Sequence, residues 1–166
     1  MFRTIKDFTN AFQYESDSTL KVFRNIDNTT LNLTPHDNIR SMRRLVWHIT
    51  ITLGEMLGKA GLNIDCPDEH SKPLEDINEI CKIYERASKS VLEQVEKNWK
   101  DSELTDEVEM YGEKWSKGII LTVLIKHEAH HRGQLTTLMR LQGLAVPGVY
   151  GPSREEWAIW NMQAPE

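Results

Sequence analysis

The stretch Trp115–Leu141 reads WSKGIILTVLIKHEAHHRGQLTTLMRL, and it decides the fold of this chain. Its apolar residues recur at intervals of three and four, which predicts one long amphipathic α-helix. Each helical residue turns the chain by about 100°, so His127 and His131 fall on the same side of this helix. Four apolar residues share that side: Ile120, Leu124, Leu135 and Leu138. The pattern predicts a core-facing helix that carries two histidines among its inward residues.

Three further segments with helical periodicity precede this one, at about residues 4–28, 35–59 and 74–99. Thr34 and Pro35 predict the start of the second segment, because an N-cap residue followed by proline is typical of a helix N-terminus. Gly61 and Gly143 predict helix ends, since glycine readily adopts the left-handed conformation that follows a last turn. The sequence thus predicts four long helices.

The remaining segments are short. Residues 101–114 lack helical periodicity and predict either an irregular connection or a short hairpin. Ser153 and Glu156 have capping-box spacing, which predicts a short last helix through Trp160. Four amphipathic helices pack most simply as a bundle. We therefore expect an all-α four-helix bundle with a short extra C-terminal helix, in a single domain spanning residues 1–166.

Composition and charge exclude several classes of protein. The formal net charge is −5, and residues 65–109 hold fourteen acidic and six basic side chains. Such an acidic middle argues against nucleic-acid binding, which needs a basic face. No apolar run is long enough to span a membrane, and the N-terminus lacks the apolar core of a secretory signal. Cys66 and Cys81 show no disulfide or CxxC pattern, so we expect free thiols and a cytoplasmic protein.

His127 and His131 lie one helical turn apart, so both imidazoles can reach one metal ion. His130 falls about 60° to the side of His127 and is expected outside the metal's ligand set. His48, on the edge of an inward-facing arc of the second helix, is the candidate third ligand, whereas His36 and His70 are weaker choices. Three histidines would leave one coordination position open. The alternative is that these histidines lie in the core and are held by hydrogen bonds alone. Their spacing in the sequence does not distinguish the two.

Other residues that could contribute to such a site are interpreted one by one. Gln134 could hydrogen-bond a ligand, as a possible catalytic residue, or could be a helix-packing amide. Gly133 could permit a close approach between helices. Glu55 could orient a ligand, but most helix carboxylates face solvent, and solvent is the preferred reading. The arginines Arg40, Arg43 and Arg44 are interpreted as a solvated helix end rather than a phosphate site.

Longer motifs add a resemblance. His127, His131, Gly133 and Gln134 stand in an H-x-x-x-H-x-G-Q pattern that is followed by LQGLAVPGVYG, and WHIT surrounds His48. These features resemble the DinB family, also described as DinB/YfiT-like metalloenzymes, over nearly the whole chain. The resemblance implies a four-helix bundle, often dimeric, whose three histidines hold zinc, nickel or a similar divalent ion. Related families include transferases and isomerases that use small thiols such as bacillithiol or mycothiol.

These observations predict a metal-dependent enzyme with a site formed by His48, His127 and His131. The resemblance favours transfer of a low-molecular-weight thiol to an electrophile, with that thiol as co-substrate. The alternatives are a metal-dependent hydrolase and a non-catalytic, stress-related protein in which the metal is structural. We expect a small-molecule substrate and a homodimer, with neither nucleic acid nor membrane as a partner.

Overall fold

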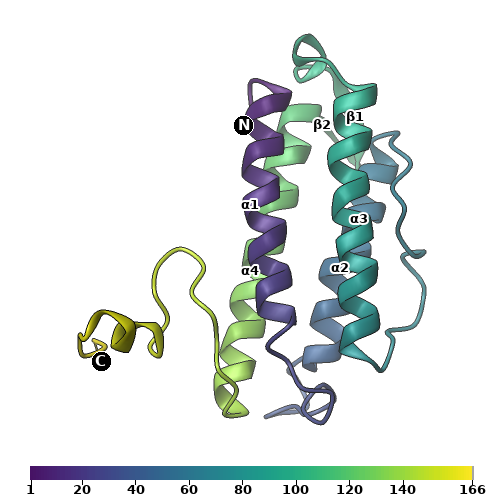
Figure 1. Ribbon diagram of the computed structural model, residues 1–166. Helices are drawn as coiled ribbons and strands as arrows, with labels where there is room; N and C mark the ends of the chain where they lie inside the picture. Colours follow the sequence, from purple (N-terminus) through teal and green to yellow (C-terminus); the bar gives the residue numbers. More distant parts are fainter. Residues whose placement is uncertain (166) are drawn as a thin grey trace.

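The computed structural model describes residues 1–165 and contains a bundle of four long α-helices (Figure 1). The helices are α1 (Ile5–Phe23), α2 (Met42–Lys59), α3 (Ile77–Asn98) and α4 (Lys117–Leu141). Strands β1 (Glu107–Met110) and β2 (Glu113–Ser116) form an antiparallel pair between α3 and α4, and short 3-10 helices span η1 (Asp101–Glu103) and η2 (Glu156–Trp160). The predicted four-helix bundle is confirmed.

The core lies between the helices, with α2 packed against α3 and α4 and with α1 packed against the same two helices. Large side chains fill the core, because the apolar face of each helix is covered only by the apolar faces of its neighbours. Phe8 and Phe12 of α1 stack with ring centroids 5.4 Å apart, and Trp47 of α2 and Tyr84 of α3 are almost fully buried. No helix within residues 1–165 is long and apolar enough to cross a membrane.

The predicted start of the second helix is wrong. The helix α2 begins at Met42, and the Oγ of Ser41 accepts a hydrogen bond from the backbone N–H of Arg44 at 3.2 Å. Residues 32–40, including the Thr34-Pro35 pair, are all exposed. A helical turn there would bury no apolar face, and tertiary burial supplies most of a helix's stability. The first helix likewise ends at Phe23 rather than near residue 28.

The predicted helix ends at Gly61 and Gly143 are confirmed. Both glycines have positive φ, 87° and 74°. After Gly61 the N–H of Leu62 donates to the carbonyl of Leu57 at 2.9 Å, and after Gly143 the N–H of Leu144 donates to that of Met139 at 2.9 Å. These bonds satisfy carbonyls that the helix itself leaves free, as in a Schellman motif.

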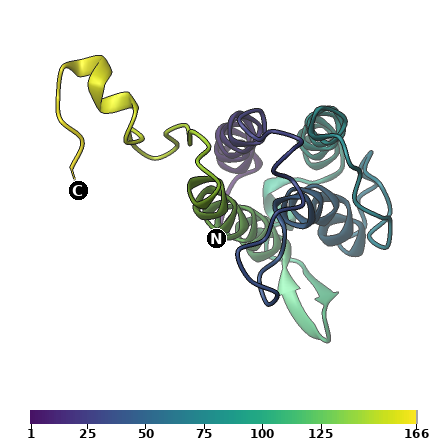
Figure 2. The ribbon, with the colours of Figure 1, turned by 90° about the horizontal axis from the view of Figure 1, so that it is seen from below.

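The connection at residues 101–114 contains a short hairpin, one of the two alternatives that the sequence leaves open. Its tip consists of Tyr111 and Gly112, with φ of 54° and 83°, as a two-residue hairpin turn requires. Val108 pairs with Trp115 across the strands. Figure 2 shows this hairpin beside α2 and α4. Its residues Tyr111 and Trp115 line one cavity together with residues of those two helices.

The chain after α4 leaves the bundle as an extended arm (Figures 1 and 2). The predicted last helix is present as the short η2, and the backbone N–H of Ser153 donates to Glu156 Oε2 at 2.9 Å. The start of the arm is fixed to α1, because Lys21 Nζ donates to the carbonyl of Gly148 at 3.1 Å and the Tyr14 hydroxyl donates to that of Val149.

Candidate metal centre

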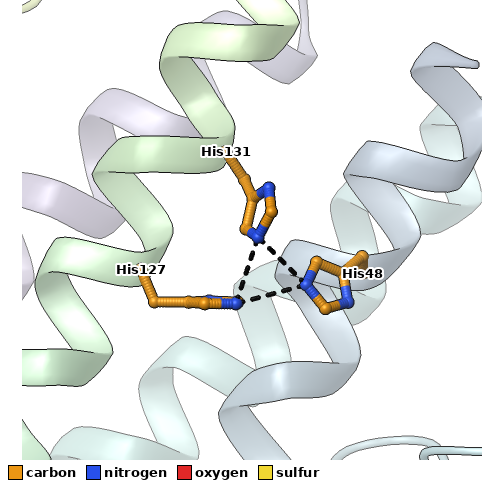
Figure 3. Close-up of side chains that lie close together, drawn as sticks. All are labelled: His48, His127 and His131. Carbon is orange, nitrogen blue, oxygen red and sulfur yellow. Dashed lines mark hydrogen bonds between the residues drawn. The ribbon is translucent and has the colours of Figure 1, made fainter. Parts of the chain in front are cut away.

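Three histidines from two helices meet between α2 and α4 (Figure 3). His48 comes from the first half of α2, and His127 and His131 come from successive turns of α4. The Nε2 atom of His48 lies 3.2 Å from that of His127 and 3.1 Å from that of His131, and the last two are 3.1 Å apart. The structure therefore brings together the three histidines that the sequence singles out.

The triangle of Nε2 atoms fits a metal ion better than a hydrogen-bond network. A neutral imidazole nitrogen is either a donor or an acceptor, so three mutually adjacent nitrogens always include one pair of the same kind. Zn–N bonds of about 2.0–2.1 Å in a tetrahedral site place ligand atoms roughly 3.3 Å apart. The observed separations of 3.1–3.2 Å are close to that value. Together these residues form a cluster that could hold one divalent ion.

Gln134 lies behind His131 rather than in front of it. Its Oε1 is 2.8 Å from His131 Nδ1, and its Nε2 is 3.2 Å from His130 Nε2. The amide oxygen can only accept, so His131 carries its proton on Nδ1 and turns its Nε2 lone pair toward the other two histidines. His130 is exposed and its ring lies outside the triangle, as the helical angle predicts.

The imidazoles are held in their neutral form. Burial, followed by the charges of His131 and His127 and then those of Arg40 and Arg44, lowers the pKa of His48 from 6.5 to about 4. The pKa of His127 is lowered to about 4, again mainly by burial, and that of His131 is also lowered by burial. Neutral imidazole is the form that binds metal, so the environment favours ligation near pH 7.

Two cavities flank the histidines. The Tyr111 cavity, of about 510 Å³, reaches His48 and His127; the rest of its wall consists of Arg44, Ile51, Thr52, Glu55, Met56, Glu69, His70, Tyr111, Trp115 and Val123. The Gln134 cavity, also about 510 Å³, reaches His131 on the Gln134 side; the rest of its wall consists of Asn38, Ile39, Arg40, Leu45, Thr137, Leu138 and Leu141. The Tyr111 cavity contacts two of the three candidate ligands, and the Gln134 cavity contacts one.

Glu55 faces this cavity, so the prediction that its carboxylate faces solvent is wrong. Its carboxylate accepts hydrogen bonds from the Tyr111 hydroxyl at 2.8 and 3.0 Å and lies 3.2 Å from Lys59 Nζ. Burial, then the bond to Glu55, raises the pKa of Tyr111, which keeps the phenol protonated. Sequence reasoning missed Tyr111. The only local signal was an aromatic residue before Gly112 in an expected turn, and the contact to α2 spans 56 residues.

Several other sequence candidates lie apart from the cluster. His36 is in the exposed loop before α2, and His70 borders the Tyr111 cavity without joining the triangle. Cys66 and Cys81 are free, as expected, and burial raises the pKa of each thiol to about 11. Gly133 has nothing within 4 Å of the position that a Cβ would occupy, so the proposed close helix approach there is wrong.

Comparisons with known proteins agree with this architecture. The model of the DinB family matches residues 1–163. YrdA of Bacillus subtilis (strain 168), described as an uncharacterized protein, is 31% identical over 166 residues, which cover 100% of this chain and 99% of YrdA.

Two solved structures are also similar. A DinB-like protein from Bacillus cereus ATCC 10987 has a TM-score of 0.86 at 31% identity, covering 90% of this chain and 100% of that one. The DinB-like protein YjoA from Bacillus subtilis has a TM-score of 0.67 at 19% identity over 86% of this chain and 97% of YjoA, a likeness of fold alone. With a bundle of this topology, a three-histidine cluster and a family match along nearly its whole length, the chain belongs to the DinB family.

Proposed function

We propose that this protein is a metal-dependent enzyme that binds one divalent ion, zinc or nickel, through His48, His127 and His131. The observation that carries the proposal is the convergence of three Nε2 atoms within 3.2 Å of one another at the wall of a cavity. A structural ion is normally closed by four protein ligands. Among residues 1–165 the candidate group contains three, which supports an open, catalytic position.

The chemistry that a divalent ion would supply there is Lewis-acid activation of a nucleophile near neutral pH. The described wall of the Tyr111 cavity holds no cysteine or serine, and the hydroxyl of Thr52 donates to the carbonyl of His48 at 2.6 Å. The protein therefore lacks an evident nucleophile of its own in this cavity. A water molecule or a small thiol must supply it.

We propose transfer of a low-molecular-weight thiol as the reaction, on the strength of the resemblance to thiol-using relatives. The thiolate sulfur attacks the carbon of an electrophile, a carbon–sulfur bond forms, and the leaving group departs with the electron pair of the broken bond. The thiol proton passes to solvent. In this scheme the three histidines hold the metal ion. Gln134 holds His131 in the tautomer whose Nε2 can bind the metal.

The test is an assay of metal-loaded protein with bacillithiol and 1-chloro-2,4-dinitrobenzene, beside metal-free protein and the His48→Ala variant. We expect metal-dependent formation of the aryl thioether and chloride, and its loss in the variant. Ester and amide substrates run in parallel decide the second candidate: turnover of these alone would make the protein a hydrolase. Absence of metal-dependent turnover in the whole panel would favour a structural role for the ion.

We also propose that the protein is a homodimer. The arm after α4 leaves large apolar side chains in solvent, with Ile159 74%, Trp160 56% and Met162 55% exposed. Apolar groups that gather on a projecting segment are typical of a protein–protein contact.

A further inference from the structure

The three arginines at the start of α2 differ in their partners. Arg43 lies 3.2 Å from Glu75 and forms an ion pair. Arg44 borders the Tyr111 cavity and Arg40 borders the Gln134 cavity. Within residues 1–165, neither Arg40 nor Arg44 has a carboxylate oxygen within 4.0 Å. Arg44 is exposed at the start of α2, as the interpretation of a solvated helix end predicts, and its side chain also borders the candidate site.

The acidic groups of the Tyr111 cavity already have partners. Glu55 pairs with Lys59 at 3.2 Å and accepts from the Tyr111 hydroxyl. Glu69 lies 3.8 Å from the same Lys59 ammonium group. Among the described residues of this wall, the guanidinium of Arg44 is left as a permanent charge without an opposite charge beside it. A divalent ion on neutral imidazoles would add further positive charge.

Local stability does not account for an arginine at this position. Arg44 lies in the first turn of α2, three residues after the N-cap Ser41, and that turn has no acidic residue. The N-terminal end of a helix favours negative side chains and disfavours positive ones. Glutamate is the residue that a capping box places there. An arginine does not favour the helix start, so helix stability gives no reason for it at this position.

The apolar part of the wall suits the body of a small organic molecule. Ile51, Met56 and Val123 are aliphatic or thioether side chains, and Trp115 and Tyr111 lie edge to face with ring centroids 5.6 Å apart. A volume of about 510 Å³ is within the range of metabolite sites. A guanidinium recognises carboxylate and phosphate oxygens through paired N–H donors.

We infer that the Tyr111 cavity binds a small organic anion whose carboxylate or phosphate group pairs with Arg44, while its apolar body lies against Trp115 and Met56. This places the remainder of the molecule beside His48 and His127. The inference names the substrate class of the proposed enzyme and rests on that proposal only for the statement that the bound anion is a substrate. Binding itself is measured separately.

The experiment is calorimetric titration of the zinc-loaded protein with 3-phenylpropionate, its neutral isostere 3-phenylpropanamide, and phenyl phosphate. We expect 3-phenylpropionate to bind about tenfold more tightly than the amide, a difference of about 1.4 kcal/mol. Arg44→Gln should remove this preference, and Arg40→Gln, which alters the other cavity, should keep it. Comparison of 3-phenylpropionate with phenyl phosphate shows which anionic group the site prefers.

Thermal unfolding checks that the variant is folded. Arg44→Gln should melt at or above the wild-type temperature, because it removes a cation from a helix N-terminus. His48→Ala should retain the Arg44-dependent preference at lower affinity. Anion binding is therefore tested independently of thiol transfer, and absence of transfer would not contradict it. The inference is overturned if Arg44→Gln keeps the preference, if Arg40→Gln removes it equally, or if none of the three probes binds.

Discussion

At the scale of single residues, the candidate centre depends on where each imidazole carries its proton. The contact of 2.8 Å between His131 Nδ1 and Gln134 Oε1 sets the tautomer of His131. The resulting lone pair points at the other two histidines, which is the arrangement that a metal needs. Helical spacing foretold that His127 and His131 would converge, and it placed His130 correctly outside. The assignment of His48 depended in addition on which face of α2 packs against α4, and helical spacing within one helix does not determine that.

The first prediction concerns these side chains. Replacement of His48, His127 or His131 by alanine should weaken zinc affinity by well over tenfold, because two imidazoles hold the ion poorly. Gln134→Leu should weaken it by about 10–100-fold through loss of ligand orientation. His130→Ala is the matched control and should bind zinc as the wild type does. Competition with a chelator measures all five variants, and equal affinities would refute the three-histidine assignment.

The second prediction concerns pH and the metal-free protein. His48 and His127 have a pKa of about 4 in the folded protein against 6.5 for the free side chain. Between pH 6.5 and 4 the unfolded chain therefore binds more protons than the folded chain, and stability falls as the pH falls. The free energy of unfolding should decrease across this window. The double variant His48→Gln/His127→Gln should show a shallower decrease in chemical denaturation. An identical slope would contradict the lowered pKa values.

At the scale of elements, end signals predicted helices better than start signals did. Gly61 and Gly143 end helices because glycine adopts a positive φ without a steric cost, and this property needs no tertiary contact. Pro35, by contrast, is compatible with a helix start but also with a loop. The exposed run at residues 32–40 decided the matter, since no apolar face was available there for packing.

The third prediction uses two glycines on α4. A Cβ at Gly118 would lie 2.9 Å from the Phe2 carbonyl oxygen and 3.2 Å from that of Leu104, whereas at Gly133 it would meet nothing within 4 Å. Gly118→Ala should cost about 1–3 kcal/mol through overpacking against rigid backbone. Gly133→Ala should stabilise the protein by about 0.5–1 kcal/mol, because glycine weakens a helix interior. Urea denaturation of both variants checks the opposite signs, and destabilisation by Gly133→Ala would reveal an unseen constraint.

At the scale of the whole molecule, a buried polar cluster joins α1, α4 and the C-terminal arm. Arg132, only 3% exposed, donates to Glu15 Oε2 at 2.6 Å, to Thr19 Oγ1 at 2.9 Å and to the Tyr150 hydroxyl at 2.8 Å. Tyr150 in turn donates to Glu15 at 2.7 Å. The ion pair of Arg132 and Glu15 therefore has several additional hydrogen bonds, as buried charges require.

The fourth prediction follows from this cluster. Arg132→Ala should destabilise the protein by about 3–5 kcal/mol, because it leaves the Glu15 carboxylate buried without its partner. Tyr150→Phe, which removes one hydroxyl and keeps the ion pair, should cost about 1 kcal/mol. Denaturant titration separates the two. A loss below 1 kcal/mol for Arg132→Ala would mean that water reaches Glu15 and compensates it.

The fifth prediction concerns assembly. Light scattering of the purified protein should give about twice the chain mass of 19.3 kDa. The exchange Ile159→Asp/Trp160→Asp should lower that mass toward the monomer, if the exposed apolar side chains of the arm form the contact. A wild-type monomer at micromolar concentration would count against the homodimer.

The sequence by itself determined the features that depend on local periodicity and on intrinsic conformational preference. The inward stripe of α4, its pair of histidines one turn apart and the glycine ends of α2 and α4 all follow from the helical repeat and from the allowed φ of glycine. These features need no knowledge of the neighbouring helices. For the same reason the bundle itself could be predicted, since four apolar stripes must cover one another.

Only the tertiary structure decided which side chains meet across helices. The contact of Tyr111 with Glu55 joins residues 56 apart, and the bond of Arg132 with Glu15 joins residues 117 apart. Helical angle fixes the direction of a side chain about its own axis, but the axial shift and rotation between helices depend on how all the core side chains pack together. The meeting of His48 with His127 and His131, and the place of Arg44 at the wall of their cavity, are therefore properties of the packed bundle.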